Sequence, residues 1–434
     1  MNDRQVTSEI PQRPDPSPKA RLAPDCFSLP PGVDWLPVED ALDRLRRGLS
    51  TIADIKTVPV SDAAGYVLAN SPVARRASPP RNNSAVDGYG FAYSSVVGDE
   101  ARLRLAPGRA APGHPWPGPL EAGHAVKILT GAFLPEGVDT VVLDEYSSVH
   151  NGFVSFAAPR RQGGNARMAG EDIRKGDRLF KHGQRIRANC IATLVAAGIE
   201  QVEVFERLKV AVLSTGDELC NPTDIPGSHQ IYDANRPMLL SLVARWGFSP
   251  VDLGCADDRM GDIRKRLDAG ARQADMILTS GGASAGDEDH VSRLLSTEGD
   301  LEFWRIALKP GRPLAAAKWR GTPVLGLPGN PIAAFVCSLI FARPVLCRLS
   351  GEPWTSPVGF KVPAAFEKSK KEGRREFLRA RLKADGSVDV FRSEGSGLTT
   401  GLAWSDGLVE LDEPAMKIRR GDLVRYIPYG SFGL

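Results

Sequence analysis

The sequence lacks the short motifs that most often mark a structural metal site or a nucleotide site. Its six cysteines include no Cys-x-x-Cys pair, and its six histidines include no His-x-x-x-His pair. A structural zinc site or a disulfide framework is therefore not expected, and a reducing compartment fits. The absence of G-x-x-x-x-G-K-[ST], and of G-x-G-x-x-G after a strand, argues against a P-loop NTPase and a dinucleotide-binding protein.

Strong net charge and long apolar runs are also missing. A formal charge of +3 is too small to indicate a nucleic-acid or acidic-membrane partner. The polar stretch Met1–Ile10 lacks the apolar region of a signal peptide. The longest apolar run, Ile332–Ala342, is too short to span a bilayer. These features predict a cytoplasmic protein that binds neither nucleic acid nor membrane.

What is present is the composition of a globular protein, 42% apolar and 25% charged. The length predicts about three domains. Glycine and proline, at 44 and 34 residues, favour turns and β-rich parts over a helical bundle. Residues 1–30 carry Pro11, Pro14, Pro16 and Pro18 among polar residues, which predicts a disordered leader.

Residues 209–350 alternate buried strands with helices. The pattern predicts strands at 210–213, 250–253, 276–279 and 324–327, and helices at 235–246, 261–272 and 332–346. Such alternation is typical of a doubly wound parallel sheet. The first three strands run into polar or acidic loops. Since the carboxyl ends of parallel strands share one edge, we expect a ligand site there.

The loop after the third of these strands contains Gly281-Gly282 and then Asp287, Glu288 and Asp289. Paired glycines with free amides suit a phosphate, and clustered carboxylates suit a divalent cation. An ordinary strand-to-helix loop with an acidic helix start explains the same residues about equally well. Lys309 and Arg312 could neutralise such a phosphate or be plain solvated turn residues.

The remaining segments are predicted more coarsely. Residues 38–49 and 188–198 have helical apolar spacing, and 57–70 have strand spacing with a turn at Ala64-Gly65. Residues 96–160 predict a small all-β unit with strands at 125–129 and 140–143, and 357–434 predict a small β-barrel or sandwich. The polar stretch Pro79–Gly90 fits either a plain β-turn or a binding loop.

Together these motifs resemble the molybdopterin molybdenumtransferase family, of MoeA type and including the E-domain of gephyrin. The resemblance covers nearly all of residues 33–434. It depends on seven stretches in the family's order: Asn83–Tyr89, Thr130-Gly131-Ala132, Gly170-Glu171-Asp172, Ser214–Leu219, Ser280–Asp289, Lys309–Pro313 and Leu327–Pro331.

The resemblance implies insertion of molybdenum from molybdate into adenylated molybdopterin, with Mg²⁺, and release of AMP. It implies a homodimer, with molybdopterin adenylyltransferase and molybdoenzymes as partner proteins. It also implies four domains of a multidomain α/β and β fold. They are an elongated helical dimerisation domain (31–55 plus 160–206), an inserted β domain (56–159), an α/β molybdopterin-binding domain (207–350) and a C-terminal β-barrel (351–434).

Site residues follow from the resemblance by position. Glu218 and Asp289 would hold Mg²⁺. The positions that match catalytic residues of the family are Asp87, Thr130, Asp172, Glu218, Asp258 and Asp289. The positions that match its ligand-binding residues are Ser280, Gly281, Gly282, Ser284, Lys309, Arg312, Pro328, Pro331 and Ser396.

The sequence departs from the family pattern at several positions. Arg81-Asn82 replaces the usual Phe-Asp, Val86 replaces Met, and Arg312 replaces Lys. Ala283 and Ala285 stand where valines are common. A diverged paralogue that binds the pterin or a partner with little turnover is therefore the alternative. The retained carboxylates favour the enzyme, and the missing P-loop disfavours a simple nucleotide hydrolase.

Overall fold

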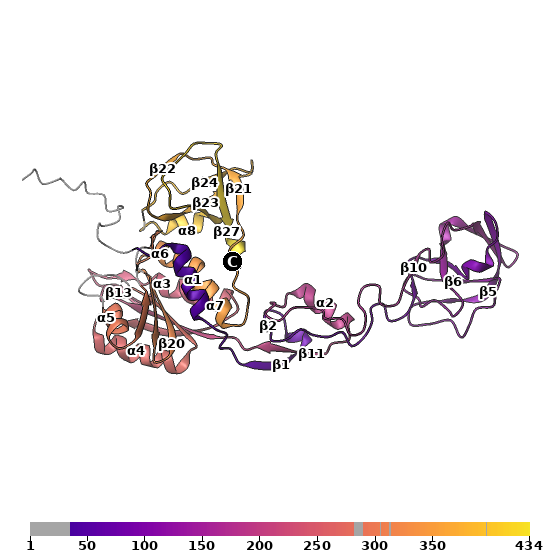
Figure 1. Cartoon of the computed structure of the whole chain (residues 1–434), viewed down its shortest axis with the longest axis horizontal. Helices are drawn as coiled ribbons and strands as arrows, with labels where there is room; N and C mark the ends of the chain where they lie inside the picture. The colour runs from indigo at the N-terminus through magenta and orange to yellow at the C-terminus, as the bar shows by residue number, and fades with distance from the viewer. Residues whose placement is uncertain (1–34, 282–289, 304, 312–313, 396) are drawn as a thin grey trace, which may run out of the picture. The chain divides into compact units, whose positions relative to one another are not determined.

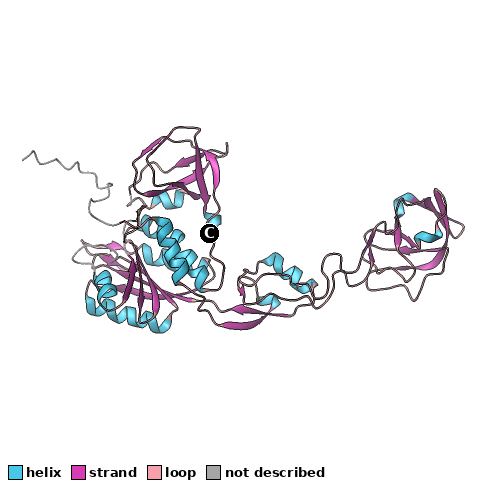
Figure 2. Cartoon of the chain, in the orientation of Figure 1, coloured by secondary structure: helices cyan, strands magenta, loops and turns pink. Residues whose placement is uncertain are grey.

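The computed structural model describes residues 35–281, 290–303, 305–311, 314–395 and 397–434 (Figures 1 and 2). The predicted leader lies outside these ranges. So do five of the predicted site residues: Gly282, Ser284, Asp289, Arg312 and Ser396.

The α/β domain is built on a six-stranded sheet with the order β15-β12-β16-β20-β19-β17. Its first four strands are parallel, as predicted. They are β12 (Lys209–Thr215), β15 (Ser249–Ala256), β16 (Met276–Ser280) and β20 (Thr322–Leu327).

The last two strands of the sheet, β19 (Ala315–Trp319) and β17 (Asp300–Phe303), are not among the strands predicted from the sequence. Each pairs antiparallel with its neighbour. The reason is local: Arg320 and Gly321, with φ of 52° and 85°, form the two-residue turn between β19 and β20. Positive φ at both central residues is typical of a tight β-hairpin.

Helices cover both faces of this sheet (Figure 1). Val210 and Val212 of β12 pack in one core with Leu239 of α3, whereas Ala211 and Leu213 pack in the other with α4 and α5. The alternation follows from the two-residue period of a strand, and it confirms the doubly wound arrangement. The helices are α3 (Asn235–Arg245), α4 (Met260–Gln273), α5 (His290–Thr297), α6 (Pro331–Cys337) and α7 (Arg343–Leu349).

The predicted helix 332–346 is observed as α6, a π-helical stretch Ser338–Ala342, and α7. Together Pro331–Leu349 is long and apolar enough to cross a membrane by length and composition alone. It is also 89% buried inside the protein, which is the behaviour of a core helix.

Helix α1 (Val38–Gly48) forms where helical spacing predicted it, in a segment that the prediction assigned to the helical dimerisation domain. Its buried residues Val38, Ala41 and Leu45 pack in the same core as Leu239 of α3 and Leu346 of α7. The apolar stripe of α1 is therefore used within the chain, against the α/β domain.

The second domain combines α2 (Ala188–Ala196) with a three-stranded antiparallel sheet in the order β1-β11-β2. Residues 56–80, predicted to belong to the inserted β domain, pack here instead. The reason is long-range pairing, because both β1 and β2 pair with β11 on the far side of the insertion. The strands are β1 (Ile55–Pro59), β2 (Val67–Leu68) and β11 (Gln201–Phe205).

The inserted domain is built on a six-stranded β-sheet, as predicted, with the order β7-β4-β6-β5-β9-β8. A short pair of β3 (Asn83–Ser84) and β10 (Ala166–Arg167) joins its two chain connections. The sheet consists of β4 (Gly88–Phe91), β5 (Glu100–Ala110), β6 (His124–Ile128), β7 (Thr140–Leu143), β8 (Ser147–His150) and β9 (Phe153–Ala157).

The C-terminal domain is β-rich, as predicted, with one short helix, α8 (Thr400–Trp404). Its larger sheet includes β18 (Leu308–Lys309) of the preceding segment, which pairs parallel with β23. The other strands of this sheet are β21 (Phe360–Pro363), β23 (Arg375–Leu382), β24 (Val388–Val390), β25 (Gly407–Leu411) and β27 (Leu423–Pro428). A separate antiparallel pair is formed by β22 (Lys368–Lys370) and β26 (Met416–Ile418).

Candidate active site

The carboxyl ends of four neighbouring strands meet at one edge of the α/β sheet. Ser214 of β12 is in register with Ser280 of β16, which is in register with Leu327 of β20. On the other side, Thr215 is in register with Ala256 of β15. The convergence predicted from the sequence is therefore confirmed. It brings together the loops that carry Glu218, Asp258, Ser280-Gly281 and Pro328–Pro331.

The loops at this edge approach one another through their backbones. Gly281 has φ of 89°, and a Cβ there would lie 2.6 Å from the Thr215 carbonyl oxygen. Only glycine fits this position without displacing β12. Gly329 lies beside it, since a Cβ on Gly329 would be in van der Waals contact with the Gly281 Cα at 3.6 Å. Asn330 and Pro331 then start α6, with Asn330 Oδ1 accepting from the amides of Ile332 and Ala333.

Several polar side chains at this edge are buried without a hydrogen-bond partner. Ser214 and Thr279 are fully buried, and Thr215 is 5% exposed. Among the described residues, their hydroxyl oxygens have no hydrogen-bond partner, and neither does the Oδ1 of buried Asn235. Buried polar atoms are nearly always paired in a native protein, and a cluster of exceptions is typical of a place where a polar ligand binds.

Carboxylates crowd the same edge. Asp217 Oδ1 accepts a hydrogen bond of 2.9 Å from the Asp258 amide. Partial burial and the negative charges of Asp217 and Glu218 raise the pKa of Asp258, against an opposing effect of His290. The Glu218 carboxylate folds over Gly216, where a Cβ would lie 2.5 Å from Oε2. A cation would relieve this repulsion.

Within the described ranges no group of three or more His, Cys, Asp and Glu side chains is arranged to hold a metal ion. Mg²⁺ commonly takes only one or two carboxylates and completes its shell with water and substrate phosphates. Glu218 at this edge is a carboxylate of the kind that Mg²⁺ prefers. The second predicted ligand, Asp289, lies outside the described residues.

The loop that carries Glu218 is held by a buried arginine that the sequence reading did not single out. Arg236 donates to Asp233 Oδ2 at 3.1 Å, to Asp252 Oδ2 at 2.6 Å and to Asn221 Oδ1 at 2.7 Å. The short pair of β13 (Leu219–Cys220) and β14 (Ile231–Tyr232) adds to the restraint. No local motif could have shown this, because the partners come from three separate segments.

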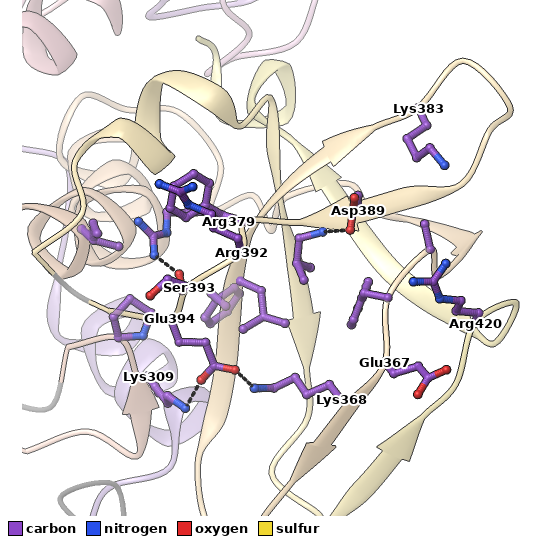
Figure 3. A pocket seen from close by; sticks show the side chains of 18 residues that line it. Lys309, Glu367, Lys368, Arg379, Lys383, Asp389, Arg392, Ser393, Glu394 and Arg420 are labelled. Carbon is purple, nitrogen blue, oxygen red and sulfur yellow. Dashed lines mark hydrogen bonds and ion pairs between the residues drawn. The ribbon is translucent and has the colours of Figure 1, made fainter.

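Lys309 lies on β18, where its ammonium pairs with carboxylates of the C-terminal domain. Its Nζ is 2.6 Å from Glu394 Oε2, and Lys368 pairs with the same carboxylate (Figure 3). Both ammonium groups also pair with Glu376, Lys309 at 3.3 Å and Lys368 at 3.0 Å. Lys309, Lys368 and Glu394 border a cavity of about 460 Å³ that also reaches Ile332 of α6. A Cβ on Gly311 would lie 3.4 Å from Pro328, so this segment adjoins the loop after β20.

The predicted catalytic pair Asp87 and Thr130 is observed on the inserted domain. Thr130 donates from its amide at 2.6 Å and from its hydroxyl at 2.7 Å to Asp87 Oδ1. These two hydrogen bonds lower the pKa of Asp87. The structure thus brings together two residues 43 positions apart in the sequence.

Asp172 follows a loop that contacts Asn82, one of the residues that depart from the family pattern. Asn82 Oδ1 accepts from the Ala169 amide at 2.8 Å, and the Asp172 amide donates to the Ser78 carbonyl at 3.2 Å. The Arg81 guanidinium lies 5.7 Å from the centre of the Phe133 ring. Asn82 therefore supports the loop before Asp172, whereas Arg81 packs against Phe133.

The fold and the edge together define a multidomain protein of the MoeA class. Residues 36–198 match the MoeA N-terminal region (domains I and II), and residues 211–348 match a probable molybdopterin binding domain. Residues 361–429 match the MoeA C-terminal region (domain IV). The chain belongs to the molybdopterin molybdenumtransferase family.

Similar proteins cover almost the whole chain. A molybdopterin molybdenumtransferase of Haemophilus influenzae is 31% identical over 91% of this chain and 98% of its own length. Molybdopterin molybdenumtransferase 2 of Mycobacterium tuberculosis is 32% identical over 84% and 93%. The crystal structure of a molybdopterin biosynthesis moeA protein from Pyrococcus horikoshii OT3 has a TM-score of 0.79 at 26% identity, covering 91% of this chain and all of that one.

Proposed function

We propose that this protein inserts molybdenum from molybdate into adenylated molybdopterin and releases AMP, as a cytoplasmic step of molybdenum cofactor biosynthesis. The observation that carries the proposal is the edge of the α/β sheet. Buried hydroxyls without partners lie there beside Gly281 and beside the carboxylates of Asp217, Glu218 and Asp258. The names of the relatives supply the substrate class.

In this proposal the residues after β16 bind the terminal phosphate of the pterin: Ser280, Gly281, Gly282 and Ser284. Glu218 and Asp289 would hold Mg²⁺, which would supply positive charge next to the pyrophosphate. Lys309 and Arg312 neutralise charge on the same group, and Pro328, Pro331 and Ser396 shape the surrounding cleft. Asp258 would add a third carboxylate near the cation.

Asp87 and Thr130 form a separate hydrogen-bonded cluster on the inserted domain, and Asp172 lies on the segment after it. We propose that the protein is a homodimer whose cleft takes residues from both subunits, so that this cluster completes the site of the other copy. Molybdopterin adenylyltransferase and molybdoenzymes would then be its partners before and after the reaction.

The test uses purified protein with adenylated molybdopterin, molybdate and Mg²⁺, and it measures release of AMP and of active cofactor. We expect Glu218→Gln and Asp289→Asn each to slow AMP release by about a hundredfold or more, as is common when a group that stabilises developing charge is lost. Both variants should keep the melting temperature and still bind the intact adenylated pterin.

Asp289 has a structural alternative, because α5 begins at His290. A helix-capping Asp289 predicts a stability loss of about 1 kcal/mol or less on change to Asn, with almost no effect on AMP release. The matched control is Glu298→Gln, whose carboxylate pairs with Arg264 on the surface of the same domain and should leave release unchanged. Wild-type protein that binds the pterin but releases no AMP would support the non-enzymatic paralogue.

A further inference from the structure

Asn235, the first residue of α3, connects two loops of the candidate site. Its Nδ2 donates to Ser280 Oγ at the end of β16 and to the Gly329 carbonyl after β20, both at 2.7 Å. The side chain is deeply buried, since only 6% of the residue is exposed. Neither the sequence motifs nor the proposed roles above include this residue.

The orientation of the Asn235 amide is determined by its surroundings. A backbone carbonyl can only accept a hydrogen bond, so the atom that faces Gly329 must be the NH₂ group. Both hydrogens of that group are then used, one on Gly329 and one on Ser280. The Oδ1 atom is buried and has no partner.

This orientation decides how Ser280 can bind a ligand. Because Ser280 Oγ already accepts from Asn235, its own hydroxyl hydrogen remains to be donated elsewhere. Across the described residues, Ser280 Oγ shows no hydrogen bond besides the one from Asn235. A hydroxyl that can donate a hydrogen bond at this edge of the sheet suits a ligand with an anionic oxygen, such as a phosphate.

We propose that Asn235 is a positioning residue that holds the Ser280 hydroxyl as a hydrogen-bond donor to the phosphate group of the pterin substrate. The inference depends on the proposed function, since it concerns the same phosphate. It adds a residue that acts through Ser280 and does not itself touch the phosphate.

The start of α3 is rigid enough for this role. Asp233 Oδ1 accepts from the amides of Asn235 at 3.2 Å and Arg236 at 3.1 Å. Arg236, through Asp252 and Asn221, fixes the same turn to β15 and to the segment after β13. These hydrogen bonds restrain the position of Asn235, and therefore the direction from which its Nδ2 donates to Ser280 Oγ.

The experiment compares binding of molybdopterin and of its dephosphorylated form, by equilibrium dialysis, to wild type, Asn235→Ala, Ser280→Ala and the double variant. We expect Asn235→Ala to weaken binding of molybdopterin by about tenfold, the typical effect of losing one hydrogen bond to a charged group. Binding of the dephosphorylated form should change less than twofold. The double variant should resemble Ser280→Ala alone, because the two residues act through one contact.

A residue with only a structural role would weaken both ligands equally, and that outcome overturns the inference. Asn235→Leu, which keeps the number and branching of the side-chain heavy atoms, replaces Asn235→Ala if the latter does not fold. Ser338→Ala is the control for loss of a buried hydroxyl, since Ser338 Oγ donates to the Ala334 carbonyl within its own helical segment. If wild type itself does not distinguish the two ligands, the proposed phosphate site fails, whatever Asn235 does.

Discussion

At the scale of single residues, two carboxyl groups of the candidate site are shifted in opposite directions for identifiable reasons. Two hydrogen bonds from Thr130 lower the pKa of Asp87. Partial burial and neighbouring negative charge raise the pKa of Asp258. An ionised Asp258 therefore costs folding stability above its raised pKa, and a bound cation would remove that cost. Asp87 needs no such help to stay ionised.

We expect Thr130→Val to raise the pKa of Asp87, because valine keeps the shape of threonine but cannot donate from its side chain. The backbone amide of residue 130 still donates, so the pKa should return only part of the way to its ordinary value. An NMR titration of the Asp87 carboxyl carbon measures the change directly.

The sign of the stability effect follows from the lowered pKa. The contribution of ionised Asp87 is present above the ordinary Asp pKa and is lost as the pH falls through the lowered one. Thr130→Val should therefore narrow the acid range over which the protein keeps its stability. Thr130→Ser retains the hydroxyl and should titrate like wild type; a shift in Ser equal to that in Val would contradict the role of the hydroxyl.

At the scale of elements, the most constrained position near the candidate site is Gly88, directly after Asp87. It lies in β4 between β6 and β7, in register with Ile128 and Leu143. A Cβ there would lie 1.8 Å from the Val142 carbonyl oxygen. The absence of a side chain lets β4 and β7 pair, and their pairing fixes where Asp87 faces Thr130.

We expect Gly88→Ala to destabilise the inserted domain by about 2–3 kcal/mol, because backbone atoms must move to admit the methyl group. Hydrogen exchange of residues 88–91 and 140–143, read by mass spectrometry, should accelerate accordingly. Gly261→Ala is the control, since Gly261 lies in α4 with nothing within 4 Å of the added carbon. Unchanged exchange in Gly88→Ala would contradict the packing argument.

At the scale of the whole molecule, the homodimer remains a proposal. The apolar stripe of α1 packs inside the chain, so it needs no partner subunit to cover it. Cys190 and Leu194 of α2 are likewise buried in their own domain, while Val195 is 60% exposed. What supports the dimer is the family resemblance.

Light scattering at micromolar concentration should give twice the mass of the chain. If the dimer completes the site, mixing Asp87→Asn and Glu218→Gln proteins should restore part of the AMP release that each has lost, because one of the two sites in a mixed dimer is intact. A stable monomer with full activity would refute both the dimer and the shared cleft.

The sequence by itself determined the type of each domain and the edge that carries the candidate site. Alternating strands and helices predicted the doubly wound sheet, and the polar loops after 213, 253 and 279 predicted their convergence. These features are local: the period of a strand or helix and the residues that end it are written in a few adjacent positions. The predicted roles of Asp87, Thr130 and Glu218 came from the resemblance to the family, which depends on short motifs that are also local.

Only the tertiary structure decided which segments share a core and which polar atoms meet. It placed α1 on the α/β domain, paired β1 and β2 with β11 across the insertion, and added β18 to the C-terminal sheet. It also brought Asn235 to Ser280 and Gly329, and Arg236 to Asn221 and Asp252. Hydrogen bonds and apolar contacts between distant segments depend on how the whole chain packs, and a helix or strand pattern carries no record of its partner.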